Sequence, residues 1–247
     1  MKNRGFTLLE LIASVAVLGI VVTLMAMLFA DSENAWKLGA DRARTTDTAR
    51  TTLDMLTHDL EHAVADDILS YMQREDPATN CLYNIPNDEI AFVSLQNDNA
   101  DGQPTAVQVH YWLREMTNAF GQPLRRYELV RGSTVPDTDP VTSCLATRNW
   151  YDVKPSSIGV LAENVAAFRV VAMQPDGDLD RIYYSTNWAD RLPRCVDVYL
   201  ELMDDAAAKQ AATMIQDNMP CTNFVDRQVQ RYTTRVFFHN RNGYRQR

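Results

Sequence analysis

Helix-breaking residues are scarce in the first third of this chain of 247 residues. None of its ten prolines precedes Pro77, and only three of its nine glycines fall within the first 76 residues. Because proline and glycine are the residues that most often interrupt a helix, their scarcity excludes a loop-rich N-terminal region. The sequence therefore predicts one long helix there.

Charge is absent from one segment and unbalanced over the whole chain. No charged residue occurs from Leu11 to Ala30. At about 1.5 Å per residue this segment spans the roughly 30 Å of hydrocarbon in a bilayer. The complete chain carries 24 basic and 32 acidic residues, a net charge of -8, which argues against broad contact with phosphates. We expect a membrane-associated protein with no nucleic-acid partner.

Several motifs of enzyme active sites are missing. The sequence contains no Gly-x-Ser-x-Gly, no glycine-rich phosphate loop and no Cys-x-x-Cys pair. These absences argue against a serine hydrolase of the usual kind, a nucleotide-binding loop, a zinc ribbon and a thioredoxin-like redox site. We therefore predict that the protein is not an enzyme.

The apolar segment allows three interpretations. A cleavable secretory signal has a shorter apolar stretch of about 7 to 15 residues. A plain anchor fits the length, but it leaves Glu10 unexplained, since an acid costs about 2.5 kcal/mol or more near the bilayer centre. A basic leader, Met1 to Gly5, precedes Phe6-Thr7-Leu8-Leu9-Glu10 and the apolar run. This string closely resembles the type IV prepilin signature, which is the third interpretation.

The resemblance implies roles for three residues. In that family a membrane peptidase cuts after the glycine and methylates the new N-terminal residue, and these would be Gly5 and Phe6. Glu10 is then expected to pair with the Phe6 amine of a neighbouring subunit in a filament. Opposite charges attract strongly in a low dielectric, whereas either charge alone is costly there, so the pair favours one stagger. The alternative is an ordinary juxtamembrane acid.

The flanking charges predict the orientation and the domain division. Lys2 and Arg4 precede the apolar run, which places the N-terminus in the cytoplasm and the rest outside it. We expect a single-pass protein of the bacterial inner membrane with a periplasmic domain. The predicted parts are a leader (1–5), a transmembrane or filament-core helix (6–30), an amphipathic helix (31–75) and a β-rich globular domain (76–247).

The amphipathic part carries an apolar stripe at helical spacing and acids on the opposite face. The stripe predicts one helix from Phe6 to about Met72, whose second half packs on the globular domain while residues 6–29 project from it. The stripe consists of Ala49, Leu53, Leu56, Leu60, Val64 and Ile68, and the acids are Asp54, Asp59, Glu61, Asp66 and Asp67.

The remaining sequence predicts an antiparallel β-rich domain, so the fold class is α+β. Two segments alternate apolar and polar residues with the period of a half-buried strand, 107–113 and 196–202. A helix is expected from Asp204 to Met219, because Pro220 ends it. Further strands are predicted at 89–95, 124–131, 165–173, 181–185 and 232–239. The prepilin resemblance implies the same architecture, the pilin fold.

The globular part resembles one branch of that family over residues 50–242. The segments YWLRE, LRRYELVRG, GVLAENVAAFRVVA, LPRCVDVYLELMD and YTTRVFFHNRN are similar to the minor pseudopilin J of type II secretion and the minor pilin W. The chain departs from them in a long insert between Arg131 and Ile158 and in its four cysteines. The resemblance implies a minor subunit near the tip of a filament.

That resemblance also implies partners, namely other pilins or pseudopilins, the prepilin peptidase and an inner-membrane assembly platform. The alternative function is an exported binding or metal-dependent domain that uses the helix only as a tether.

Four cysteines lie in the predicted exported part, which suggests two disulfides in an oxidising compartment. Three pairings are allowed. Loops flank Cys81 and Cys144, while Cys195 and Cys221 bracket a strand and a helix, so we predict 81–144 and 195–221. Buried free thiols are the alternative.

Three short patterns contain metal-ligating residue types. His58-Asp59-Leu60-Glu61-His62 matches the H-x-x-E-H pattern of inverzincin proteases, but Leu60 belongs to the apolar stripe, so we expect ordinary helix-face residues. Calcium is the candidate cofactor at two oxygen-rich loops, although polar turns explain both. The loop residues are Asn97, Asn99 and Asp101, and Asp176, Asp178 and Asp180.

Overall fold

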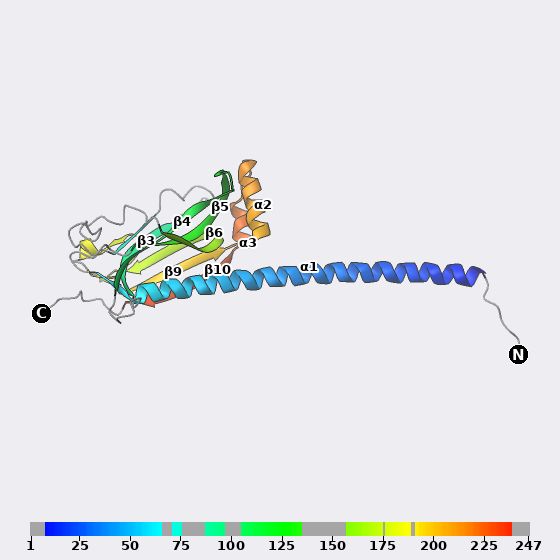
Figure 1. Cartoon of the computed structure of the whole chain (residues 1–247), viewed down its shortest axis with the longest axis horizontal. Helices are drawn as coiled ribbons and strands as arrows, with labels where there is room; N and C mark the ends of the chain where they lie inside the picture. The colour runs from blue at the N-terminus through cyan, green and yellow to red at the C-terminus, as the bar shows by residue number, and fades with distance from the viewer. Residues whose placement is uncertain are drawn as a thin grey trace. The chain divides into compact units, whose positions relative to one another are not determined.

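The computed structural model describes residues 8–65, 71–75, 87–96, 105–134, 157–174, 176–188 and 191–238, with only the backbone of Gln96, Thr105, Thr186 and Trp188. By its internal contacts the chain divides into two units, Met1–Arg44 and Thr45–Arg247. A long helix and an antiparallel sheet dominate the described residues (Figure 1), which confirms the predicted α+β class.

The long helix, α1, runs from Leu8 to Glu61 over 54 residues. Within the described residues the first unit consists of this helix alone. The second unit contains the last part of α1 and all other elements. The division at Arg44 falls inside the predicted 31–75 segment.

The second unit is built around a sheet whose neighbouring strands mostly follow one another along the chain. Across the sheet the order is β10-β9-β6-β5-β4-β3-β2-β8, while β1 pairs with β3 and β7 with β6. Each of these pairs is antiparallel. The strands are β1 (Ala63–Val64), β2 (Met72–Glu75), β3 (Asp88–Gln96), β4 (Thr105–Thr117), β5 (Pro123–Thr134), β6 (Ile158–Met173), β7 (Leu179–Asp180), β8 (Tyr183–Tyr184), β9 (Cys195–Leu202) and β10 (Gln230–Phe237).

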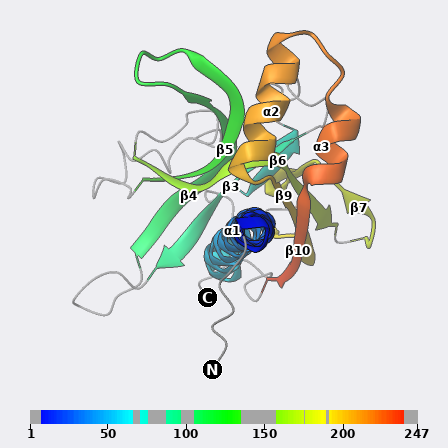
Figure 2. The same ribbon diagram turned by 90° about the vertical axis from the view of Figure 1, so that its right-hand side faces the viewer.

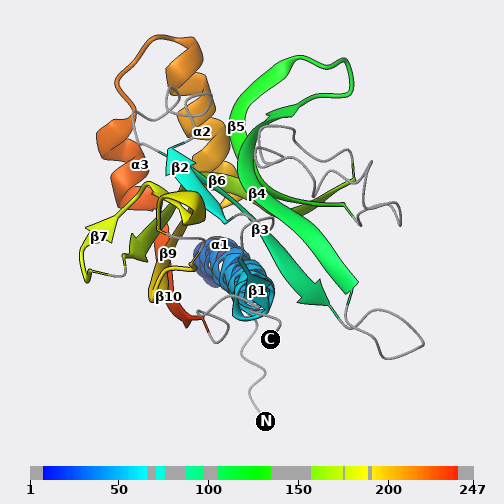
Figure 3. The same cartoon turned by 90° about the vertical axis from the view of Figure 1, so that its left-hand side faces the viewer.

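A bend in β6 curves the sheet. Its first half pairs with β5 and its second half pairs with β9, and the register shifts on both sides of Asn164. Asn164 has a φ of 58°, in the left-handed region that asparagine tolerates better than most residues. Around the last turns of α1, the sheet curves from β3 and β4 on one side to β9 and β10 on the other (Figures 2 and 3).

Two short helices follow β9 at one end of the sheet. α2 (Asp205–Gln216) is capped by Asp204, whose side chain accepts a hydrogen bond from the Ala207 amide. It buries small alanine side chains in the core, and α3 (Thr222–Gln228) contributes Val225. A 3₁₀ turn, η3 (Ser185–Trp188), follows β8.

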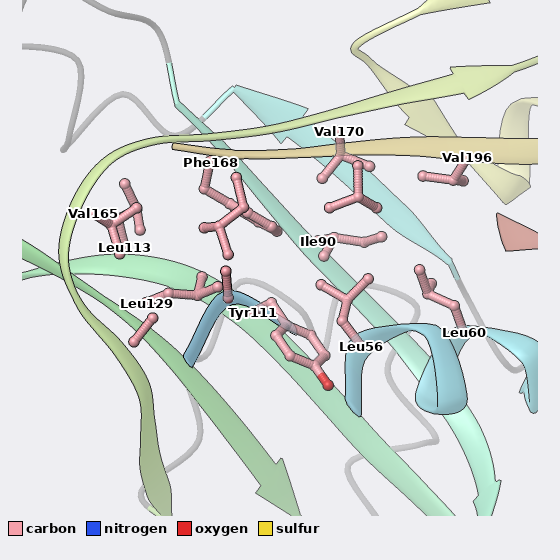
Figure 4. Packing of buried hydrophobic residues seen from close by; sticks show 14 of the residues in the cluster. Leu56, Leu60, Ile90, Tyr111, Leu113, Leu129, Val165, Phe168, Val170 and Val196 are labelled. Atoms are coloured by element: carbon pink, nitrogen blue, oxygen red, sulfur yellow. The ribbon is translucent and has the colours of Figure 1, made fainter. Parts of the chain in front are cut away.

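The core lies between the last turns of α1 and the concave face of the sheet. Leu56 and Leu60 are fully buried and point toward Ile90, Tyr111 and neighbouring strand residues (Figure 4). Fully burying one such side chain contributes about 1.5 to 3 kcal/mol. The predicted stripe therefore docks the helix on the sheet, although Leu53 is only half-buried.

Strand β4 differs from its predicted half-buried pattern, because both of its faces are covered. Tyr111 belongs to the core, and His110 and Trp112 on the opposite face are buried as well. His110 Nε2 lies 3.3 Å from Glu89 Oε2, and Arg74 Nε donates to Glu89 Oε1 at 2.5 Å. Burial alone would raise the pKa of Glu89, but His110 and Arg74 lower it to about 2.

The helix ends earlier than predicted, and residues 72–75 form a strand. α1 stops at Glu61, and Ala63–Val64 pairs with Ser94 and Val93 of β3. Val64 therefore packs in a small cluster with Met72 and Val93 instead of continuing the helical stripe. Pairing with β3 overrides a helical pattern that is only a weak local preference. Ile68, Asp66 and Asp67 lie outside the described residues.

We predict that Leu56→Ala lowers the free energy of unfolding by about 2 to 5 kcal/mol, because it leaves a cavity under α1. Met55→Ala, one position earlier and 43% exposed, is the matched control and should change stability by at most about 0.5 kcal/mol. Urea unfolding of the full chain in detergent, followed by near-UV circular dichroism, measures both. Equal stability of the two variants would contradict this packing.

Candidate functional site

The N-terminal part of α1 presents apolar side chains that no other described residue covers. Leu8, Ile12 and Phe29 are 78%, 59% and 74% exposed. The most apolar 18-residue window of the helix has a mean hydropathy of 2.7 and is 0% buried, so the helix is long and apolar enough to cross a membrane. A surface of this kind needs lipid or another protein around it.

Glu10 lies in the first turn of this helix, among exposed apolar residues. Gly5 and Phe6, the predicted cleavage and methylation residues, lie outside the described residues.

The last turns of α1 are attached to the sheet through a buried carboxylate. Tyr111 Oη donates a hydrogen bond to Asp59 Oδ2 at 2.5 Å, and Arg131 Nε donates to the same oxygen at 2.7 Å. Asp59 is 3% exposed. A buried charge is stable only when it is paired and hydrogen-bonded, so the helix fits the sheet in the one position where β4 and β5 supply these donors.

Asp59, Tyr111 and Arg131 form a triad in which each group affects the protonation of the others. Burial, followed by the nearby Asp59 carboxylate, raises the pKa of Tyr111 well above its usual range, which keeps the phenol a hydrogen-bond donor. Burial alone would lower the pKa of Arg131, but Asp59 raises it, so the guanidinium stays charged. Sequence periodicity predicts that Asp59 lies on the solvent face of the helix, and this prediction is wrong. Asp59 is buried because Tyr111 and Arg131, from strands distant in the sequence, bind its carboxylate.

Two hydroxyl groups add polar contacts along the same helix face. Thr52 Oγ1 donates to the Leu161 carbonyl oxygen at 3.2 Å, next to the bend in β6. Thr46 Oγ1 lies 3.1 Å from Tyr232 Oη of β10. The docked face of α1 is therefore polar at Thr46, Thr52 and Asp59 and apolar at Ala49, Leu56 and Leu60.

The acidic loop at 176–180 is held by hydrogen bonds within the protein. Asp176 Oδ1 accepts from the Asp178 amide at 3.1 Å, and Asp180 accepts from the Ile182 amide and from Gln174 Nε2, both at 3.0 Å. In the described part of the chain no three His, Cys, Asp or Glu side chains gather as cation ligands. Asn97, Asn99 and Asp101 lie outside that part.

A buried ion pair attaches the end of this loop to β3. The Arg181 guanidinium donates to the Asp88 carboxylate, which also accepts from the Val170 amide at 2.7 Å. Gln73 Nε2 donates to the Arg181 carbonyl oxygen at 3.0 Å. Burial raises the pKa of Asp88 to about 6, although Arg181 and the Val170 amide oppose the shift.

The predicted disulfide between Cys195 and Cys221 is not formed, although both side chains are buried. Cys221 packs in the core, together with Val196 of β9. Successive residues of a strand face opposite sides of the sheet, so Cys195 points away from that core. Cys81 and Cys144 lie outside the described residues.

The two histidines of the H-x-x-E-H pattern, for which we expected no metal, are exposed at the end of α1. His58 lies in the last turn of the helix, His62 follows its end, and their ring centroids are 4.5 Å apart. Leu60 between them is in the core, as expected.

Residues 1–26 match the prokaryotic N-terminal methylation motif, which confirms the predicted prepilin signature. Among solved structures, a type IV-like pilin from Thermus thermophilus is similar with a TM-score of 0.44 and 12% sequence identity, covering 80% of this chain and 98% of that chain. No curated protein matches the chain. The motif and the apolar helix together indicate a membrane-anchored, exported protein.

We predict that Asp59→Ala destabilises the protein by about 3 to 5 kcal/mol, because Arg131 and Tyr111 would remain buried without their acceptor. Asp54→Ala removes an exposed carboxylate of the same helix and should change stability by at most about 0.5 kcal/mol. Urea unfolding measures both. If the Asp59→Ala protein unfolds at the wild-type midpoint, the triad does not hold the helix.

The raised pKa of Asp88 predicts a pH effect. Between its ordinary value of 3.8 and about 6 the folded state binds the proton more readily than the unfolded state. Protonation of Asp88 should therefore increase the free energy of unfolding as pH falls through that range, and it contributes nothing above about pH 6. When the pH is lowered from 7 to 4, the free energy of unfolding of wild type should rise, relative to that of Asp88→Asn, by about 2 to 3 kcal/mol at most.

Urea unfolding at several pH values measures this difference, with the exposed Asp176→Asn of the neighbouring loop as the control. A constant difference between wild type and Asp88→Asn across the range would contradict the assignment.

Proposed function

We propose that the protein is a minor pilin or pseudopilin that is inserted in the inner membrane, cleaved after Gly5, methylated at Phe6 and drawn into a filament. The observation that carries the proposal is the methylation motif at residues 1–26 leading into a helix whose most apolar window has no buried residue. A helix with apolar residues on every side suits lipid before assembly and the packed interior of a filament after it.

Glu10 supplies the specificity that an apolar helix lacks. Apolar helices slide past one another at little cost, whereas a single buried acid requires one partner position. In the proposed filament the Phe6 amine of the neighbouring subunit is that partner. The acid then determines the stagger between successive helices.

The sheet domain, attached to α1 through Asp59, would form the outer surface of the filament. Its resemblance to the minor pseudopilin J and the minor pilin W supports a place near the filament tip. The proposed partners are other pilin subunits, the prepilin peptidase and an inner-membrane assembly platform. The globular domain would be periplasmic, and the protein would act as a structural subunit rather than as an enzyme.

The test is Glu10→Gln, which keeps the side-chain shape and removes the charge. We expect membrane insertion, loss of the first five residues and one added methyl group on Phe6 to be unchanged, as measured by mass spectrometry of the membrane form. Incorporation into filaments, measured in sheared surface or periplasmic fractions, should fall by about tenfold or more, since an unpaired buried amine is costly.

Asp31→Asn on the same helix, beyond the apolar run, is the control and should assemble normally. Normal assembly of Glu10→Gln, or a mature chain that retains its first five residues, would contradict the proposal. The second outcome would instead favour an exported domain that is only tethered by its helix.

A further inference from the structure

Two histidines at the C-terminal end of α1 have no part in the proposed assembly. His58 lies in the last turn of the helix, and His62 directly follows its last residue. Both are exposed, and their ring planes are inclined by 50° with centroids 4.5 Å apart. We propose that this pair is a surface site for a divalent transition-metal ion that prefers imidazole, such as Cu²⁺ or Ni²⁺.

The separation of the rings matches a shared cation. A cation bound to one nitrogen of each ring at about 2.0 to 2.1 Å lies about 3.2 Å from each centroid. Two ligands about 90° apart, as in a square or octahedral site, then have centroids about 4.5 Å apart, whereas a tetrahedral angle gives about 5.2 Å. The observed 4.5 Å equals the value for the first case when one nitrogen of each ring points to the shared ion. Copper and nickel take that geometry.

The protonation of one ring is already suited to binding. His62 Nδ1 lies 2.8 Å from the carbonyl oxygen of His58. A carbonyl oxygen only accepts, so Nδ1 must carry the proton, and in the neutral ring Nε2 then keeps its lone pair. Metal-ligating histidines commonly donate their other N–H to a backbone carbonyl in this way, which fixes both the tautomer and the ring orientation.

The backbone that carries the two rings is held on both sides. Asp59 and Leu60, between the histidines, are buried in the contact with the sheet. The Leu95 amide of β3 donates to the His62 carbonyl oxygen at 3.0 Å. A metal site that is fixed before binding loses less conformational entropy when the ion arrives.

The electrostatics also favour a cation at this position. The C-terminal end of a helix carries a partial negative charge, about half an elementary charge, from its unpaired carbonyl groups. The exposed acids Asp54 and Glu61 lie within one turn of His58 on the same helix. Both effects raise the local concentration of divalent cations.

This site differs from the catalytic zinc site that the H-x-x-E-H pattern suggests. Such a centre needs a third protein ligand, and the described residues bring no third His, Cys, Asp or Glu side chain to the pair. The remaining coordination positions would be taken by water or by a donor from another molecule. The proposed site therefore binds a metal ion but lacks the third protein ligand that a hydrolytic zinc centre needs.

The test uses the full chain in detergent, purified without a polyhistidine tag and titrated with Cu²⁺ by calorimetry. We expect one strong equivalent, with an electron paramagnetic resonance spectrum that shows two coordinated nitrogens. His58→Ala and His62→Ala should each weaken this binding by about tenfold or more and remove the two-nitrogen signature. Zn²⁺ should bind more weakly than Cu²⁺.

Glu61→Gln is the matched control, because it alters the same motif and leaves both rings in place. Its affinity for Cu²⁺ should stay within about threefold of wild type, since only a nearby charge is lost. Circular dichroism confirms folding of each variant, which is expected because all three side chains are exposed. If the His58→Ala/His62→Ala double variant binds Cu²⁺ as tightly as wild type, or wild type binds none, the proposal is wrong.

Discussion

The hydrophobic effect acts on α1 in two different ways along its length, and the rest of the structure depends on that difference. Near the N-terminus the apolar side chains surround the helix and remain exposed, as at Leu8 and Phe29. From Ala49 onward they form a single stripe that the sheet covers. The first arrangement requires a surrounding apolar medium, and the second requires only the protein's own domain. One helix thus serves two environments without a break in its backbone.

Polar groups give each of these contacts a defined position. Apolar contact alone leaves the stripe of α1 free to slide on the sheet, whereas the Asp59 carboxylate is satisfied only where it meets Tyr111 and Arg131. In the proposed filament Glu10 would have the same effect, since it is the one charged residue from Leu8 to Ala30. A single acid would then limit the arrangements that the hydrophobic effect permits, as Asp59 does on the sheet.

Local patterns in the sequence predict those parts of the fold that depend on neighbouring residues. The alternation in 107–113 and 196–202 predicts β4 and β9, and Pro220 marks the end of the segment that contains α2. The end of α1 is mispredicted because Val64 leaves the helical pattern to pair with Val93, and β2 and α3 are too short for a clear period. The partners of Asp59 are 52 and 72 residues away along the chain, so no local pattern shows that this acid is buried. Gly5, Phe6 and Glu10 belong to a contiguous motif at residues 1–26, so the sequence alone is enough to propose them as site residues.

The strand order also determines when the domain can be completed. Most neighbours in the sheet are neighbours along the chain, so hairpins can form one after another with short loops to close. The contact between Thr46 and Tyr232 joins residues 186 positions apart. A chain that leaves the cytoplasm progressively cannot close this contact until its last strand has emerged. Until then the sheet lacks its edge strand β10, and the apolar stripe of α1 is not fully covered.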